Sequence, residues 1–97
     1  MIRSFRCRDT QALFEGMPGR RFGSFARTAF CKLVFRKLAI LDAAACLNDL
    51  QVPPGNRLEP LRGNRHGQHS IRINDQFRLC FVWTEAGPEE VEIVHYH

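Results

Sequence analysis

Three groups of side chains in this sequence of 97 residues have the residue types that chemistry on phosphate groups requires. They are the cluster of His95, Tyr96 and His97, the basic loop 62–67, and Arg78. Histidine is the side chain whose ordinary pKa lies near neutrality, so two histidines beside a tyrosine can act as an acid and a base. The alternative for this cluster is a frayed polar terminus without a role.

Arg78 is the cation with the most unusual surroundings. Phe77 and Leu79 flank it in a stretch that alternates like a strand. A charge between apolar residues is costly unless a partner compensates it. A phosphate group is one possible partner and a salt bridge to Glu59 or Glu92 is another, so both interpretations stay open.

The basic loop carries Arg62 and Arg65 on a turn flanked by glycines. Such a turn can follow a phosphate backbone without reading bases, although an ordinary solvated loop has the same pattern. Cleavage of RNA by its own 2′-hydroxyl needs a base, an acid for the leaving 5′-oxygen and cations for the phosphate oxygens. If the three groups converge on one face, they supply all of these.

Zinc binding is the other use that the histidines allow. His95 and His97 are two residues apart and share one face if the strand persists, and His66 and His69 precede them. However, no third and fourth ligands follow at a recognised spacing, and the cysteines are not paired as in structural zinc sites. We therefore predict no metal site and no cofactor.

Charge is distributed unevenly along the chain, whose formal net charge is +4. Residues 1–84 carry all 14 Lys and Arg against 6 acids, or +8, whereas residues 85–97 carry 4 acids and neither Lys nor Arg, or −4. Of the 14 cations 12 are Arg, whose planar guanidinium suits phosphate contact and base stacking. This favours RNA as a partner, and a solvated basic surface is the alternative.

The first half of the chain predicts one strand and two helices. Alternation predicts a strand over 2–7, and Asp9 can cap a short helix that ends near Gly16. Apolar residues at three- and four-residue steps predict a long helix over 26–47, with Lys32 and Arg36 on its outer face.

The second half predicts three strands. The turn 52–56 contains two prolines and cannot continue a helix. Beyond residue 68 the apolar period becomes two, with turns at 74–75 and 86–88. The order β-α-α-β-β-β predicts an α+β fold of two helices packed on a small, mostly antiparallel sheet.

Composition and segment lengths also predict where the protein acts. Its 97 residues suit a single domain, 1–97, and charges interrupt the apolar residues before position 12, which is atypical of a secretion signal. The apolar stretch 38–47 is too short to cross a membrane. The four cysteines lie in apolar patterns, so we expect reduced, mostly buried thiols and a cytoplasmic protein.

Three segments resemble a known family. They are 53–58 (PPGNRL), 67–78 (GQHSIRINDQFR) and 91–94 (VEIV) before Tyr96 and His97. With these segments, which cover about residue 52 onward, and a looser match upstream, the chain resembles the HigB-like toxins of the RelE superfamily, also described as plasmid maintenance killer proteins.

The resemblance implies a RelE-like fold and a toxin of a type II toxin-antitoxin pair. Such a toxin is a ribosome-dependent, metal-independent endoribonuclease that cuts mRNA in the 16S rRNA decoding site. A HigA-like helix-turn-helix antitoxin would neutralise it and would provide the link to operator DNA, and no membrane is involved.

The resemblance also implies roles for single residues. Arg78 takes the position that stabilises the phosphate, and Tyr96 and His97 take the terminal catalytic positions; His95 completes the predicted catalytic set. The cations expected to contact RNA or the ribosome are Arg57, Arg62, Arg65, Arg72, Lys32 and Arg36.

Three positions depart from the family pattern. His95 replaces the aspartate of the usual Asp-Tyr-His motif, Glu59 stands where some relatives have a catalytic histidine, and Asn64 replaces an aspartate in the basic loop. Loss of the acid beside Tyr96 removes a charge that could orient or activate a neighbour. A toxin homologue that binds the ribosome, RNA or its antitoxin without efficient cleavage is therefore the alternative function.

Overall fold

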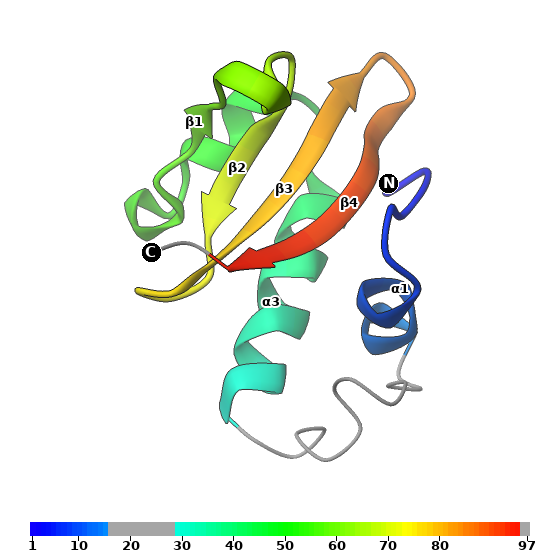
Figure 1. The fold of residues 1–97 in the computed structure, drawn as a ribbon, viewed down its shortest axis with the longest axis vertical. Coiled ribbons are helices and arrows are strands. Elements are labelled where there is room, and N and C mark those ends of the chain that lie inside the picture. The colour runs from blue at the N-terminus through cyan, green and yellow to red at the C-terminus, as the bar shows by residue number, and fades with distance from the viewer. Residues whose placement is uncertain (16–28, 96–97) are drawn as a thin grey trace.

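The computed structural model describes residues 1–15 and 29–95. Figure 1 shows the order of its helices and strands along the chain. The α-helices are Arg8–Phe14 (α1) and Ala29–Ala43 (α3), the 3-10 helices are Leu47–Gln51 (η1), Pro54–Asn56 (η2) and Gly63–Arg65 (η3), and the strands are Glu59–Pro60 (β1), His69–Arg72 (β2), Phe77–Thr84 (β3) and Gly87–His95 (β4).

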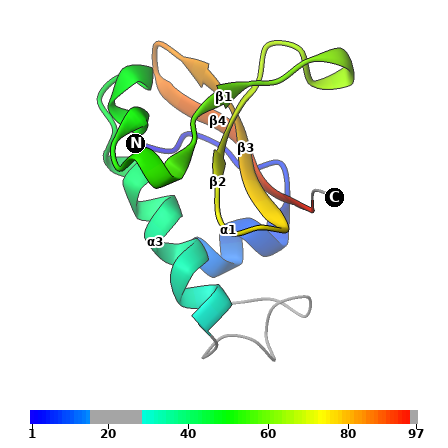
Figure 2. The same cartoon turned by 90° about the vertical axis from the view of Figure 1, so that its left-hand side faces the viewer.

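The four strands form one antiparallel sheet in the order β1-β2-β3-β4. The predicted turn between β2 and β3 is present, and the Asn74 side chain holds it by accepting the backbone N–H groups of Gln76 and Phe77 at 2.9 and 2.8 Å. α3 lies along one side of the sheet, while α1 lies beside the edge of β4 (Figures 1 and 2). The predicted helices and antiparallel hairpins are confirmed.

The core forms between α3 and the sheet. Leu79 pairs with Ile71 on β2 and with Ile93 on β4, so these three side chains share one face. That face meets the apolar stripe of α3, as the two sequence periods predict. The largest contributors are fully buried, namely Val34, Leu38, Leu41, Ile71, Leu79, Phe81 and Val91.

α3 ends earlier than its apolar pattern predicts. The predicted helix ran over 26–47, of which 26–28 lie outside the described residues, and the observed helix ends at Ala43. The Asp49 carboxylate accepts the backbone N–H groups of Ala45 and Cys46 at 2.9 and 3.3 Å. These hydrogen bonds turn the chain into η1 and hold the pKa of Asp49 below its ordinary value, because they favour the ionised carboxyl.

The strand predicted over 2–7 is reduced to a single parallel bridge between Phe5 and Val91. The segment still lies along β4, because Arg3 donates its backbone N–H to the Pro88 carbonyl at 2.8 Å and Val91 donates to the Ser4 carbonyl at 3.2 Å. Its alternation is loose, since basic and apolar residues do not repeat at a strict period of two. It therefore borders the sheet without joining it as a strand.

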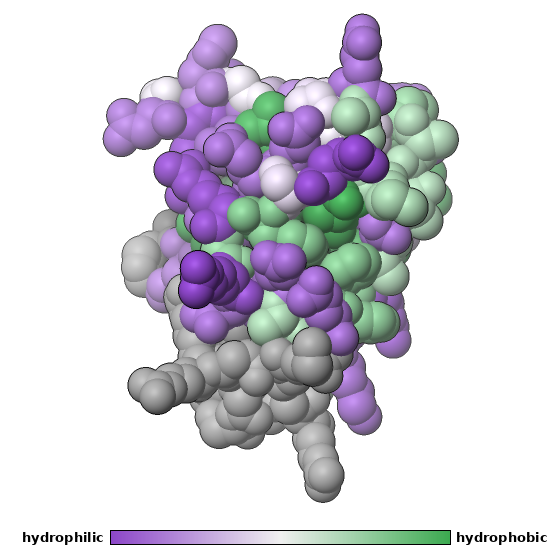
Figure 3. Space-filling view, turned by 90° about the vertical axis from the view of Figure 1, so that its right-hand side faces the viewer, coloured by the Kyte–Doolittle hydropathy of each residue, from purple (hydrophilic) through white to green (hydrophobic). Residues whose placement is uncertain are grey.

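Aromatic rings connect this N-terminal segment to both helices. The Phe14 ring of α1 lies 5.8 Å from the Phe5 ring and 6.3 Å from the Phe35 ring of α3, measured between centroids. Figure 3 shows apolar surface between hydrophilic side chains on this side of the molecule. Ring contacts of this kind hold α1 although it has only seven residues.

The prediction of mostly buried thiols is correct for part of the set. All four cysteines are free, and Cys31 and Cys80 are buried, but Cys7 is half-buried and Cys46 is exposed. Cys46 is exposed because α3 ends before it. None of the described helices is long and apolar enough to cross a membrane.

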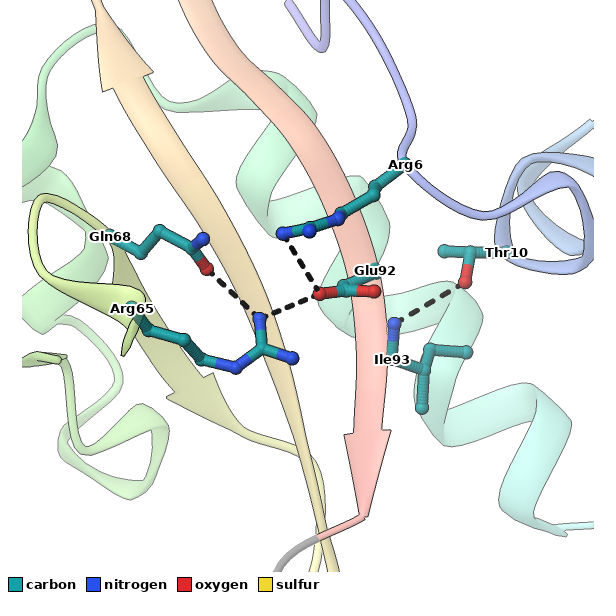
Figure 4. A network of polar contacts seen from close by, with 6 residues as sticks. All are labelled: Arg6, Thr10, Arg65, Gln68, Glu92 and Ile93. Atoms are coloured by element: carbon teal, nitrogen blue, oxygen red, sulfur yellow. Dashed lines mark hydrogen bonds and ion pairs between the residues drawn. The ribbon is translucent and has the colours of Figure 1, made fainter. Parts of the chain in front are cut away.

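Thr10 of α1 completes the hydrogen bonding of β4. Its buried hydroxyl accepts the backbone N–H of Ile93 at 3.3 Å, where the sheet has no further strand (Figure 4). A buried N–H without an acceptor is costly, so a side-chain oxygen here replaces a strand partner. The hydrogen bond fixes β4 two residues before its end.

We expect Thr10→Val to lower the free energy of unfolding by about 1–3 kcal/mol, because the isosteric valine leaves the Ile93 N–H unsatisfied. Urea unfolding followed by circular dichroism measures the difference. Gln11→Ala, at an exposed position of the same helix, is the control and should change stability by less than about 0.5 kcal/mol. Equal stability of Thr10→Val and wild type would show that the hydrogen bond contributes nothing.

Candidate active site

The face of the sheet that points away from α3 carries most of the polar strand residues; we call it the polar face. Alternation places every second side chain of β2, β3 and β4 there, opposite the core. The strand register sets Arg78 beside Arg72 on β2 and Val94 on β4, and Cys80 beside Ser70 and Glu92. The polar face thus holds one of the three predicted groups, Arg78, at its centre.

Arg78 is held by contacts from three directions. Its Nε donates to Ser70 Oγ at 2.6 Å, and its Nη2 donates to the Arg57 carbonyl at 2.6 Å and more weakly to the Ser70 carbonyl at 3.4 Å. Glu59 Oε1 lies 3.5 Å from Nε. Of the two salt bridges left open above, the one to Glu59 is therefore present, while Glu92 contacts other cations.

The guanidinium of Arg78 retains a group with no partner among the described residues. Its side chain is 12% exposed, and Nη1 makes none of the hydrogen bonds that fix Nε and Nη2. A planar guanidinium fixed along one edge presents its other N–H groups in a set direction. This arrangement can bind a phosphate oxygen without a change of rotamer.

The carbonyl that holds Arg78 belongs to a rigid turn. Arg57 follows η2 with φ 47°, a left-handed conformation that is uncommon for a residue with a side chain. The Asn56 side chain is fully buried and donates from Nδ2 to the carbonyls of Leu50 and Val52, both at 3.2 Å. The sequence indicates a turn here, but it does not show that the turn supplies an acceptor to Arg78.

Lys37 of α3 ties the same turn to the helix. Its Nζ donates to Asn56 Oδ1 at 2.6 Å, and the lysine is only 8% exposed. Burial lowers the pKa of Lys37, and the positive charges of Arg72 and Arg36 lower it further. Lys37 falls on the apolar stripe with Val34 and Leu41, so its spacing could have identified a buried cation.

The basic loop folds back over the polar face. Arg65 Nη1 donates to Glu92 Oε1 at 2.6 Å and to Gln68 Oε1 at 3.2 Å, and Arg6 Nη1 approaches the same Glu92 oxygen at 3.9 Å (Figure 4). The Glu92 side chain is only 17% exposed. Arg65 is therefore half-buried and tied to β4, unlike a residue of the ordinary solvated loop that was the alternative interpretation, whereas Arg62 is exposed.

The other predicted cations occupy two sides of the molecule. Arg72 lies on the polar face and pairs with Asp75, and Arg57 is exposed at the end of the turn. Lys32 and Arg36 are exposed on α3, the helix on the other side of the sheet. The structure thus places Arg57 and Arg72 next to Arg78 and ties Arg65 to the same face through Glu92, whereas Lys32 and Arg36 lie on the helix behind the sheet.

His95 lies on the side of the sheet opposite Arg78. It pairs with Phe77 across β3 and β4, and the two ring centroids are 4.8 Å apart. The Phe77 ring in turn lies 5.0 Å from that of Phe30 on α3. The structure therefore does not bring His95 and Arg78 together, while Tyr96 and His97 lie outside the described residues.

The remaining histidines do not gather around a common point. His66 is exposed in the basic loop, whereas the His69 ring stacks against Phe81 with centroids 6.4 Å apart. Within residues 1–15 and 29–95, no three His, Cys, Asp or Glu side chains are placed to share a metal ion.

A family model described as the RelE-like toxin of the type II toxin-antitoxin system HigB matches residues 22–97. The chain belongs to the HigB-like toxin family. Toxin HigB-1 of Vibrio cholerae is 58% identical over 53 residues, 55% of this chain and 56% of that protein. An uncharacterized protein of Haemophilus influenzae is 42% identical over 52 residues, 54% of this chain and 52% of that protein.

The chain spans about half the length of these curated relatives. Among solved structures, a chain of the YoeB-YefM complex from Staphylococcus aureus matches with a TM-score of 0.62 and 18% identity, over 100% of this chain and 98% of that chain. The likeness confirms the predicted α+β, RelE-like fold of this HigB-like toxin.

The lowered pKa of Lys37 predicts how stability varies with pH. Between that pKa and the ordinary lysine pKa, the unfolded chain holds the proton and the folded protein has lost it, so the free energy of unfolding rises with pH. We expect wild type to gain stability relative to Lys37→Met as the pH rises through the range just below the ordinary lysine pKa of about 10.

Urea unfolding of both proteins across this range measures the gain. Lys32→Met is the matched control, because Lys32 is exposed on the same helix and its removal should leave the pH dependence unchanged. A constant difference between wild type and Lys37→Met would mean that Lys37 keeps its ordinary pKa.

Proposed function

We propose that this HigB-like toxin is a ribosome-dependent mRNA endoribonuclease that inhibits translation. The observation that carries the proposal is the fixed Arg78 guanidinium, whose Nη1 has no hydrogen-bond partner within residues 1–15 and 29–95 and which lies on the polar face among other arginines. A preorganised cation of this kind stabilises charge that develops on a phosphate during cleavage. Membership of the HigB-like family supports the same activity.

The proposed reaction is attack of the RNA 2′-hydroxyl on the adjacent phosphorus. The 2′-oxygen loses its proton to a base, the bond to the 5′-oxygen breaks, and an acid protonates that oxygen. Arg78 stabilises the crowded phosphate, and Tyr96 and His97 exchange the protons, as the family resemblance implies. These side chains can carry the reaction without a metal ion or a cofactor.

His95 has a different part in this proposal. Its ring packs on Phe77, on the α3 side of the sheet, so it does not reach a phosphate bound by Arg78. We assign it to fixing the end of β4, from which the chain continues to Tyr96 and His97. Catalysis then requires no imidazole from position 95.

The proposed partners follow from the charges and the comparisons. Arg57, Arg62, Arg65 and Arg72 would grip mRNA and 16S rRNA of the decoding site, because phosphates attract clustered arginines. Lys32 and Arg36 would contact the ribosome through the outer face of α3. The structural neighbour is a chain of the YoeB-YefM complex, in which two different proteins are bound to each other. This supports a protein partner that acts as the antitoxin, and we propose a HigA-like helix-turn-helix protein. The site of action would be the cytoplasm, and operator DNA would be reached only through the antitoxin.

A toxin that binds but barely cleaves is the second candidate. The observation in its favour is that position 95 has neither the acid of the family motif nor a place on the polar face. Such a protein would still occupy the ribosome or its antitoxin through the same arginines.

We expect wild-type protein to cut mRNA on purified translating ribosomes in the presence of a chelator, and Arg78→Ala to cut at least about 100-fold more slowly. Mapping of the mRNA ends measures both rates. Arg8→Ala removes an equal charge from an exposed position of α1 and should cut like wild type. Ribosome binding without cleavage by well-folded wild type would contradict the enzyme and establish the binding protein.

We expect Glu92→Gln to bind single-stranded RNA more tightly than wild type, because it frees Arg65 and Arg6 for phosphates. Each additional phosphate contact should steepen the log–log dependence of affinity on salt by about 0.7. Fluorescence anisotropy at several salt concentrations measures the slope. Glu85→Gln removes the same charge from an exposed turn, so an equal change in both variants would refute a specific release of Arg65.

A further inference from the structure

We infer that Lys37 and Asn56 are positioning residues for Arg78 and act through the backbone carbonyl of Arg57. The inference rests on the proposed function only for its effect on the rate of cleavage. It joins three observed contacts: Lys37 Nζ to Asn56 Oδ1 at 2.6 Å, Asn56 Nδ2 to two carbonyls, and Arg78 Nη2 to the Arg57 carbonyl at 2.6 Å.

The Arg57 carbonyl decides how the guanidinium lies. Ser70 accepts from Nε of Arg78 at 2.6 Å but from Nη2 only weakly at 3.4 Å, so these contacts leave the guanidinium plane some freedom to tilt. The short contact from Nη2 to the Arg57 carbonyl at 2.6 Å removes that freedom and sets the direction of Nη1. Catalysis depends on such alignment, because small displacements of a reacting group cost large factors in rate.

The direction of this carbonyl depends on the turn before it. Arg57 has φ 47°, and its N–H donates to the Pro54 carbonyl at 3.1 Å, while the Asn56 N–H donates to the Pro53 carbonyl at 2.9 Å. A left-handed residue with a side chain persists only when its surroundings enforce it. The buried Asn56 side chain provides that enforcement, since it binds the carbonyls of Leu50 and Val52.

Lys37 determines the orientation of the Asn56 amide. Its Nζ binds Oδ1, so Nδ2 must point to the two carbonyls of the preceding segment. Arg36 and Arg72 repel the buried ammonium, and burial itself disfavours it. Apolar residues often replace a buried polar pair without loss of stability. Stability alone therefore does not require Lys37, whereas the alignment of Arg57 and Arg78 does.

The experiment separates alignment from stability by replacing both polar partners. Lys37→Met with Asn56→Leu replaces both partners of the buried Lys37–Asn56 hydrogen bond by apolar side chains, but the Leu50 and Val52 carbonyls lose their donor, so we expect a lower thermal midpoint that still leaves the protein folded at the assay temperature. We expect the maximal single-turnover rate of mRNA cleavage on ribosomes to fall about tenfold, and the toxin concentration at half-maximal rate to stay unchanged. Asn48→Leu, at an exposed position of η1, is the control.

The same double substitution in the Arg78→Ala background tests the route of the effect. If Lys37 and Asn56 act through Arg78, substituting them lowers the cleavage rate no further once Arg78 is already alanine. A full additional tenfold loss, or a wild-type rate in the folded double variant, would overturn the inference. If the double variant does not fold, Asn56→Asp provides the test, because it keeps the acceptor for Lys37 while a carboxylate oxygen replaces Nδ2 and repels the Leu50 and Val52 carbonyls.

Hydrogen exchange of the Arg78 side-chain N–H groups, followed by nitrogen-edited NMR, gives a readout that does not need cleavage. We expect faster exchange in the Lys37 and Asn56 variants than in wild type and Asn48→Leu. Unchanged exchange would refute the positioning role even if cleavage falls. A wild type that never cuts mRNA, but whose Arg78 exchange quickens in the variants, would refute the proposed function and retain the positioning of Arg78.

Discussion

The anchoring of Arg78 inside the sheet is the constraint on which the site depends. A guanidinium that is 12% exposed must find acceptors, and neighbouring segments supply them: Ser70 from β2, the Arg57 carbonyl from the turn after η2, and Glu59 from β1. The turn after η2 and the two-residue edge strand β1 thus complete the surroundings of one side chain.

Carboxylates on the polar face pair with its arginines. Glu92 holds Arg65, Asp75 holds Arg72, and Glu59 lies beside Arg78. Each pair keeps a long side chain in one place, so less conformational freedom is lost on binding. The proposed RNA binding would require a phosphate to displace a carboxylate, and the exposed Asp75 and half-exposed Glu59 form weaker ion pairs than the largely buried Glu92. The surface is therefore ordered in the free protein without being fully neutralised.

The periodicity of apolar residues predicts the helices and strands, but it does not predict the side-chain contacts between them. The apolar periods identified α3 and the three long strands, because each buries a regular face. The end of α3 was missed because Asp49 captures two amides by a local contact that no period encodes. The contact of Arg65 with Glu92 was missed because it requires the register of β4 against the loop. The pattern of a cation between apolar strand residues singled out Arg78 and the family resemblance added its expected role, whereas its acceptors depend on the folded turn.

The side on which position 95 lies explains how a histidine fits there. Cross-strand pairing places His95 against Phe77, and Phe77 contacts Phe30 of α3, so position 95 borders an aromatic group. An imidazole can stack on the Phe77 ring while the exposed part of His95 stays in water. The departure from the family's aspartate is thus matched by its neighbours. Histidine in place of aspartate at position 95 therefore removes no group from the polar face, because the side chain at 95 lies on the other side of the sheet.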